Sequence, residues 1–233
     1  MISLEAHVGS EITDLRNRVA SYSSEPLEKY PGVTRILSAS KDMAGLDAWR
    51  TSVGDAEADR IINESIQIGN SLDEMFNESL RKDNFDPGAY SATPLALRLW
   101  RQLKPSLDYI VPVSVQTKVW SNRRRVMGYL DCLGYYKGTL SVIDCKNARR
   151  EKTEQHLMDY FLQCTAYASC LDEMFGVFPE QIVVMVARRD FPLPQIIVRP
   201  TRDYLDTLDE RIRKYYENRK DDPPAIDVNQ PFH

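Results

Sequence analysis

The chain of 233 residues has only three histidines and four cysteines, and no cysteine pair has the Cys-x-x-Cys spacing. This scarcity excludes the usual zinc and iron–sulfur ligand sets. No apolar run reaches the 18 residues that a membrane helix needs, so no membrane partner is expected. The net charge of −4 excludes a protein that coats nucleic acid through a uniformly basic surface. The cysteines are therefore expected to be reduced core thiols, at positions Cys132, Cys145, Cys164 and Cys170.

The N-terminal residues lack the basic and apolar pattern of a targeting segment. Glu5 and Glu11 come early, and no apolar stretch follows them. We expect neither a secretory signal nor a transit peptide. The expected location is therefore the cytoplasm, where thiols stay reduced.

What the chain does contain is typical of one globular domain, with 42% hydrophobic and 27% charged residues. We expect a single domain over residues 1–222, followed by a tail over residues 223–233. Within the domain, we expect a mainly helical part (1–107), a core (108–200) and a C-terminal helix (201–220).

Hydrophobic periodicity and turn residues predict the individual elements. Helices are expected at Ser10–Tyr22, around Thr34–Leu37, over most of Leu46–Lys82, and at Leu95–Leu107, Glu154–Phe175 and Tyr204–Tyr216. Strands are expected at Tyr109–Trp120, Val126–Tyr136, Thr139–Lys146, Gln181–Ala187 and Gln195–Val198. This order predicts an α/β fold, with a mixed central sheet flanked by helices and a helical N-terminal layer.

The most informative segment is a predicted hairpin around Lys137-Gly138. If these two residues form the turn, Tyr136 pairs with Thr139, and the same register places Asp131 directly opposite Asp144. Opposed side chains share one face about 5 Å apart, so the two carboxylates repel each other unless a proton or a cation lies between them. Lys146 follows Asp144 by two positions and points to the same face.

Two other interpretations of this segment remain open. Asp131 and Lys146 could form an ordinary cross-strand ion pair, with Asp144 solvated at the strand end. A three-residue turn would instead shift the register by one and place the two aspartates on opposite faces.

At these residues the sequence resembles the PD-(D/E)xK nuclease superfamily, through Asp131 and the Asp144-Cys145-Lys146 tripeptide. The RecB-like exonuclease branch is the most similar, especially the mitochondrial genome maintenance exonuclease type and its phage relatives. The segments that carry this resemblance are Tyr30–Leu37, Gly128–Cys132, Val142–Lys146 and the Gln-x-x-x-Tyr motif of Gln163 and Tyr167.

The resemblance implies a restriction-endonuclease-like core and a site for Mg²⁺ or Mn²⁺, which prefer oxygen ligands. The implied metal ligands are Asp131, Asp144 and the backbone carbonyl of Cys145. Lys146 is the implied third catalytic group, beside Asp131 and Asp144. Gln163 and Tyr167 are implied to bind substrate, on a side of their helix away from the apolar stripe of Leu157, Phe161, Cys164, Ala168, Leu171 and Phe175.

The sequence departs from the family pattern at two positions. Gly69 and Asp73 match a Gly-x-x-x-His motif, with aspartate in place of histidine. Asp73 could still bind a hard metal, with Glu74 and Glu78 as nearby alternatives, or it could lie on a solvated helix face. Gln116 stands where relatives often have glutamate, and we expect it to support the site rather than bind metal.

Basic residues gather around the expected site. Residues 118–152 hold nine basic and only three acidic side chains, which gives a local charge of +6. Arg149, Arg150 and Lys152 are candidates to bind backbone phosphates. The turn residues Arg123–Arg125 are a second candidate, or simply a solvated loop. Three aromatic residues could stack on bases or pack in the core: Trp49, Trp100 and Trp120.

These observations favour a metal-dependent deoxyribonuclease that hydrolyses DNA from its ends, with single-stranded DNA as the expected substrate, in phage or bacterial DNA processing, recombination or repair. The alternatives are an endonuclease on the same core, and a degraded nuclease fold that only binds nucleic acid or a protein. The chain has no recognisable helicase segment. A helicase, a single-strand-binding protein or a recombination protein would therefore be a separate partner, in a bacterial or phage-infected cell.

Overall fold

The computed structural model describes residues 2–39, 44–82, 85–89 and 93–219. The helices are α1 (Ile2–Ala20), α2 (Val33–Ala39), α3 (Ala44–Val53), α4 (Asp55–Arg81), α5 (Pro94–Leu107), α6 (Glu154–Phe175) and α7 (Leu205–Glu217), with short 3₁₀ turns η1 (Pro87–Ala89) and η2 (Thr201–Tyr204). The strands are β1 (Ile110–Ser121), β2 (Val126–Tyr136), β3 (Thr139–Ala148), β4 (Gln181–Arg188) and β5 (Gln195–Pro200). None of the described helices is long and apolar enough to cross a membrane.

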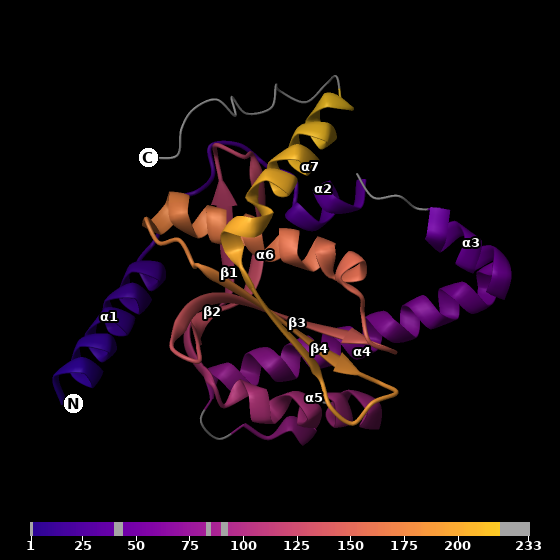
Figure 1. Cartoon of the computed structure of the whole chain (residues 1–233), viewed down its shortest axis with the longest axis horizontal. Coiled ribbons are helices and arrows are strands. Elements are labelled where there is room, and N and C mark those ends of the chain that lie inside the picture. The colour runs from indigo at the N-terminus through magenta and orange to yellow at the C-terminus, as the bar shows by residue number, and fades with distance from the viewer. Residues whose placement is uncertain (1, 40–43, 83–84, 90–92, 220–233) are drawn as a thin grey trace.

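The five strands form one mixed sheet in the order β1-β2-β3-β4-β5. The β3–β4 pair is parallel and is connected through α6, whereas the other neighbours are antiparallel. Helices α2, α6 and α7 cover one face, and α4 and α5 cover the other (Figure 1). The predicted α/β fold with a mixed sheet flanked by helices is confirmed.

Consecutive side chains of the central strands point to opposite faces of the sheet, and each face has its own hydrophobic core. Val142 and Val184 pack with α6 and α7, whereas Ile143 and Val183 pack with α4 and α5. Because consecutive side chains of a strand point to opposite faces, an apolar run such as Ile182–Ala187 serves both cores.

The predicted hairpin register is confirmed. Lys137 and Gly138 form the turn with φ of 51° and 87°, the two left-handed conformations of a type I′ turn. The β2–β3 pairs run from Tyr136↔Thr139 to Cys132↔Ile143 and stop there. The three-residue turn is therefore excluded, and Asp131 and Asp144 stand one step beyond the last pair of the ladder.

Several element boundaries differ from the prediction. The expected helix over Leu46–Lys82 is two helices, α3 and α4, because Gly54 has a φ of 84° that breaks the helical path. Helix α2 begins at Val33, so Thr34 lies inside it. The C-terminal helix ends at Glu217 after an initial 3₁₀ turn, and the expected tail over 223–233 lies outside the described residues. The four cysteines are free and buried, as predicted.

A buried ion pair ties the β1–β2 turn to the C-terminal helix. Arg124 donates from Nε and Nη2 to the two carboxylate oxygens of Asp209 in α7, at 2.8 and 3.1 Å. Its neighbour Arg125 pairs with Glu28 at 2.5 Å. Two of the three turn arginines are therefore paired within the protein, and Arg123 is the exposed arginine of the turn.

We expect Arg124→Ala to destabilise the fold by about 3 kcal/mol, because it leaves the Asp209 carboxylate without its partner. Arg123→Ala, at an exposed position of the same turn, should change stability by less than about 0.5 kcal/mol. Urea unfolding of both variants measures the difference. Equal stability of the two variants would contradict a structural role for the pair.

Candidate active site

The candidate site begins where β2 and β3 part. Beyond Cys132 and Ile143 the ladder between them ends, although β3 continues in register with β4 to Ala148. A continued ladder would pair Cys145 with a backbone carbonyl of β2. Instead, the backbone N–H of Cys145 donates to Oδ2 of Asp131 at 3.1 Å. The Asp131 carboxylate thus replaces a ladder bond and is fixed against β3.

The partner strand β1 is irregular at the same level. Val115 pairs with Cys132 and Thr117 pairs with Leu130, so Gln116 stands opposite Asp131. Gln116 has a φ of 54°, a left-handed conformation that is uncommon for a residue with a side chain. Such conformations concentrate at functional sites. The exposed Gln116 shares this level of the sheet with Asp131, where we expected it to support the site.

Lys146 and Asp144 form a direct ion pair in β3. Nζ of Lys146 lies 2.7 Å from Oδ1 of Asp144, and Asp144 is only 2% exposed. The alternative with Asp131 paired to Lys146 and a solvated Asp144 is therefore wrong. The second oxygen of Asp144, Oδ2, is buried and has no hydrogen-bond partner.

The electrostatics of this pair follow from its burial. Desolvation raises the pKa of Asp144 to about 7, with the Lys146 ammonium opposing that rise and the Asp131 carboxylate adding to it. Burial alone would lower the pKa of Lys146, but Asp144 and Asp131 raise it well above its ordinary value. Lys146 is therefore an ammonium, and its Nζ lies 5.6 Å from the centre of the Tyr160 ring of α6.

Helix α4 brings a third carboxylate to the site. Burial, followed by repulsion from Asp131, raises the pKa of Asp73 to about 7, while Lys146 lowers it. Asp73 is therefore partly desolvated within electrostatic reach of Asp131 and Lys146, and it is not on a solvated helix face. Of the alternatives, Glu78 pairs with Arg81 and Lys82, and Glu74 is exposed.

A glycine allows α4 to approach β3 this closely. A Cβ on Gly69 would lie 3.1 Å from Nδ2 of Asn147, one residue after Lys146. Arg189, which follows β4, donates to Ser65 of α4 at 3.0 Å and to Oδ1 of Asn147 at 3.4 Å. Asp73 stands one turn after Gly69, so this contact positions Asp73. Sequence reasoning missed Asn147 and Arg189, because no motif contains them.

The Gln163 and Tyr167 motif lies beside the site on α6, but its two side chains differ in access. Nε2 of Gln163 donates to the Tyr167 hydroxyl at 3.0 Å. Tyr167 is 4% exposed, and a Cβ on Gly128 of β2 would lie 2.6 Å from its ring. The prediction that Tyr167 lies away from the buried side of α6 is wrong. The sheet covers α6 on one side, and α2 and α7 cover it on others, so Tyr167 is buried as well. Tyr167 supports β2, and Gln163 is the member of the motif that is partly exposed to solvent.

The expected phosphate-binding residues follow β3. Arg149 and Arg150 are exposed, and Arg149 pairs with Asp190 at 3.3 Å. Lys152 is held through its backbone, which exchanges hydrogen bonds with the Gln195 side chain at 2.9 and 3.0 Å. Its Nζ lies 5.5 Å from the Tyr160 ring, on which Lys146 also rests. Tyr160 thus links Lys152 to the site.

The site offers a small set of donor atoms for the implied metal. Within the described ranges, no three His, Cys, Asp or Glu side chains are grouped so that they could hold a metal ion. Asp131 and Asp144 with the Cys145 carbonyl nevertheless offer only oxygen donors, and the unpartnered Oδ2 of Asp144 is a buried acceptor without a donor. Mg²⁺ commonly binds one or two carboxylates and retains several waters, so this set fits it.

Comparison with known proteins leaves the family open. No family model and no curated protein matches the chain. A solved structure described as "Crystal structure of SSO0001" aligns with 92% of this chain and 88% of its own, at a TM-score of 0.39 and 14% identity. A likeness this distant assigns neither a fold family nor a function.

We expect Asp73→Asn to stabilise the protein at neutral pH in EDTA. Between the ordinary pKa of 3.8 and the folded value of about 7, the folded protein binds more protons than the unfolded chain. The stability associated with Asp73 therefore falls as the pH rises through this window. At pH 7.5 the variant should melt several degrees higher than wild type, because each kcal/mol of added stability raises the melting temperature of a chain this size by roughly 2–4 °C. At pH 4 the variant and the wild type should have the same melting temperature.

Thermal unfolding followed by circular dichroism at both pH values measures this difference. Glu74→Gln, on the exposed side of the same turn, is the matched control and should show no such pH dependence. A neutral or destabilising Asp73→Asn at pH 7.5 would show that Asp73 is solvated.

Proposed function

We propose that the protein is a metal-dependent deoxyribonuclease with a restriction-endonuclease-like fold, and that it acts as an exonuclease on single-stranded DNA ends. The observation that carries this proposal is the arrangement of Asp131, Asp144 and Lys146 where the β2–β3 ladder ends. A purely structural role accounts poorly for aspartates placed where their charges repel each other. The resemblance of these residues to the PD-(D/E)xK pattern supports the same reaction.

The proposed metal site uses Asp131, Asp144 and the backbone carbonyl of Cys145 for Mg²⁺ or Mn²⁺. Asp73, where the similar family has histidine, adds negative charge near the site but, within the described part of the chain, is not grouped with the other two carboxylates as a third ligand. A divalent cation held there polarises the phosphodiester and lowers the pKa of a bound water. Burial of Asp144 with an unpartnered oxygen supports this assignment, because a cation would offset the cost of a buried negative charge.

Lys146 supplies the fixed positive charge of the site. An ammonium has three N–H donors, and one of them already bonds Oδ1 of Asp144. The other two are available for a phosphate oxygen and for the attacking water. Because Asp144 and Tyr160 hold Lys146 in place, its charge is oriented before substrate arrives, which is the condition for efficient transition-state stabilisation.

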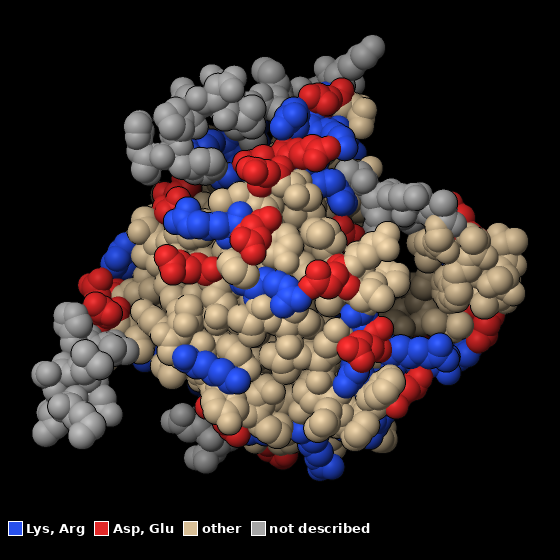
Figure 2. Space-filling view, viewed as in Figure 1, with Lys and Arg blue, Asp and Glu red and all other residues tan. Residues whose placement is uncertain are grey.

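The distribution of charge supports binding of one DNA strand at the site rather than general coating of DNA by the protein surface. The face in Figure 2 shows basic and acidic side chains interspersed, without a broad basic field. The exposed Arg149 and Arg150 directly follow β3 and are suited to hold the phosphates next to the scissile bond. The choice of ends over internal sites rests on the family resemblance.

The assay compares end-labelled linear single-stranded DNA with circular single-stranded DNA, in Mg²⁺, Mn²⁺ or EDTA. Degradation of the linear strand alone, and its loss in EDTA, is the result expected of the exonuclease. Cutting of circles would instead identify an endonuclease. Binding without cleavage under any metal would leave only the degraded, binding-only fold.

We expect Lys146→Ala to reduce cleavage by at least about 100-fold, since it removes the preorganised charge at the phosphate. The matched control is Lys137→Ala, in the exposed turn of the same hairpin, which should cleave like wild type. Initial rates on labelled single strands measure both variants. Near-normal cleavage by a folded Lys146→Ala protein would remove Lys146 from the mechanism.

A further inference from the structure

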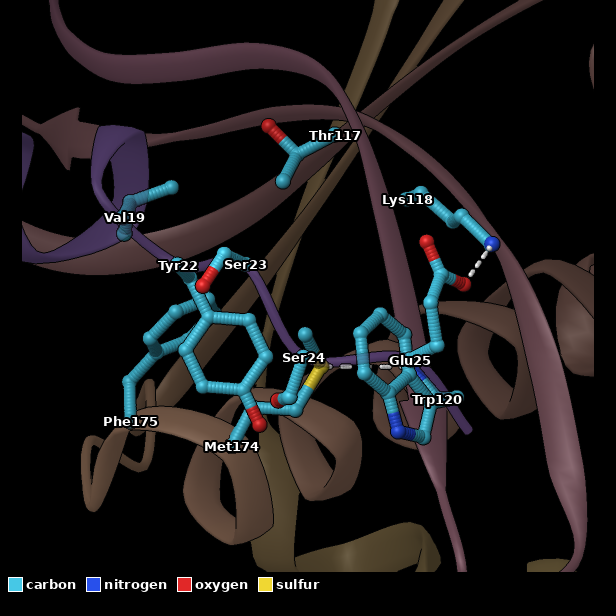
Figure 3. A pocket seen from close by; sticks show the side chains of 10 residues that line it. All are labelled: Val19, Tyr22, Ser23, Ser24, Glu25, Thr117, Lys118, Trp120, Met174 and Phe175. Atoms are coloured by element: carbon cyan, nitrogen blue, oxygen red, sulfur yellow. Dashed lines mark hydrogen bonds and ion pairs between the residues drawn. The ribbon is translucent and has the colours of Figure 1, made fainter. Parts of the chain in front are cut away.

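A hollow of about 240 Å³ lies beside β1 at the C-terminal end of α6 (Figure 3). Its walls come from the end of α1 and the chain after it, from β1 and from α6. Apolar and polar side chains contribute equally to these walls. The lining residues that matter here are Tyr22, Glu25, Lys118, Trp120 and Phe175.

Aromatic rings shape this groove. The Tyr22 ring meets Phe175 edge-on, with 4.8 Å between ring centres, and lies 5.6 Å from the ring centre of Trp120. Trp120 is 5% exposed and forms the wall, whereas Tyr22 is 37% exposed. Tyr22 is therefore an aromatic side chain held by rings on its inner side and open to solvent on another.

A cation stands at the rim of the groove. Nζ of Lys118 lies 5.6 Å from the Trp120 ring centre and 2.7 Å from the Glu25 carboxylate. The Glu25 side chain is 73% exposed and that of Lys118 is 34% exposed. An ion pair this exposed contributes little stability, so Lys118 can exchange Glu25 for a phosphate without a large loss.

The register of the β1–β2 pair relates the groove to the candidate active site. Lys118 pairs in register with Tyr129, and Tyr129 precedes Asp131 by two residues. Two residues of a strand span about 7 Å. Tyr129 is 57% exposed, although a large ring on this strand could have been buried. Moving away from Asp131, the exposed Tyr129 comes first, Lys118 is its neighbour on β1, and the aromatic groove lies beside Lys118.

We propose that Tyr129, Lys118 and Tyr22 form a stacking track for a single strand of DNA that extends from the catalytic aspartates. This inference rests on the proposed nuclease function and names the residues that bind the substrate strand outside the catalytic site. Bases stack on exposed aromatic rings without regard to sequence, and a lysine beside the rings binds the intervening phosphate. Bases inside a duplex already stack on each other, so the track selects unpaired strands.

The test is fluorescence anisotropy with a labelled thymidine oligonucleotide of about 15 nucleotides, in EDTA so that no cleavage occurs. Tyr129→Ala should weaken binding by about tenfold, the loss expected for one stacked base. Tyr109→Ala is the matched control. Tyr109 is also 57% exposed, but it comes just before the first residue of β1, at the opposite end of the strand from Lys118. This variant should bind like wild type.

Tyr22 packs on Phe175, so its variants are chosen to separate stacking from folding. Tyr22→Phe should retain binding and Tyr22→Leu should lose about tenfold, with similar melting temperatures. Lys118→Gln should reduce the slope of log Kd against log salt by about one, whereas Lys137→Gln, in the distant hairpin turn, should not.

Equal binding by Tyr129→Ala and Tyr109→Ala would overturn the track, as would equal affinity of the wild type for single-stranded and duplex DNA, or no binding at all. These outcomes are independent of the cleavage assay. A wild-type protein that binds through the track but never cleaves would refute the nuclease function alone. A protein that cleaves with unaltered binding in the variants would refute the track alone.

Discussion

Three carboxylates and one ammonium share a partly desolvated space at the end of the β2–β3 ladder, and the rest of the site is arranged around this imbalance of charge. Asp144 is buried against Lys146, and Asp131 accepts the backbone N–H of Cys145. Asp73 approaches from α4, and its pKa rises to about 7 as it is desolvated beside Asp131. One lysine offsets only part of this negative charge. The arrangement is costly to folding and is suited to a divalent cation.

The site forms where the regular strand pairing of the sheet is interrupted. The sheet is regular where it builds the two cores, and β2 leaves β3 one step before the opposed aspartates. On the other side of β2, Gln116 adopts a left-handed conformation opposite Asp131. Gly69 lets α4 reach β3 at Asn147. These irregularities lie at one place in the fold, where Asp131, Asp144 and Lys146 come together.

The sequence predicted the parts of this structure that depend on short-range rules. The Lys137-Gly138 turn set the hairpin register, and alternation placed Lys146 on the same face as Asp144. It did not predict the break at Gly54, because a single glycine inside a helical pattern is often tolerated. Arg189 was also missed, since its contacts with α4 and β3 join segments more than 40 residues apart. The burial of Tyr167 depends on helices that cover α6 from several sides, which periodicity along α6 alone cannot reveal.

Asp131 and Asp144 are proposed to hold a divalent cation beside Lys146. The most direct measurement is a crystal structure of the protein soaked with Mn²⁺, with anomalous scattering used to locate the metal. We predict an anomalous peak within bonding distance of carboxylate oxygens of Asp131 and Asp144 and of the Cys145 carbonyl, roughly 2.0–2.2 Å away. A fully active crystal form with no peak at these residues, or with manganese bound only elsewhere, would contradict the account.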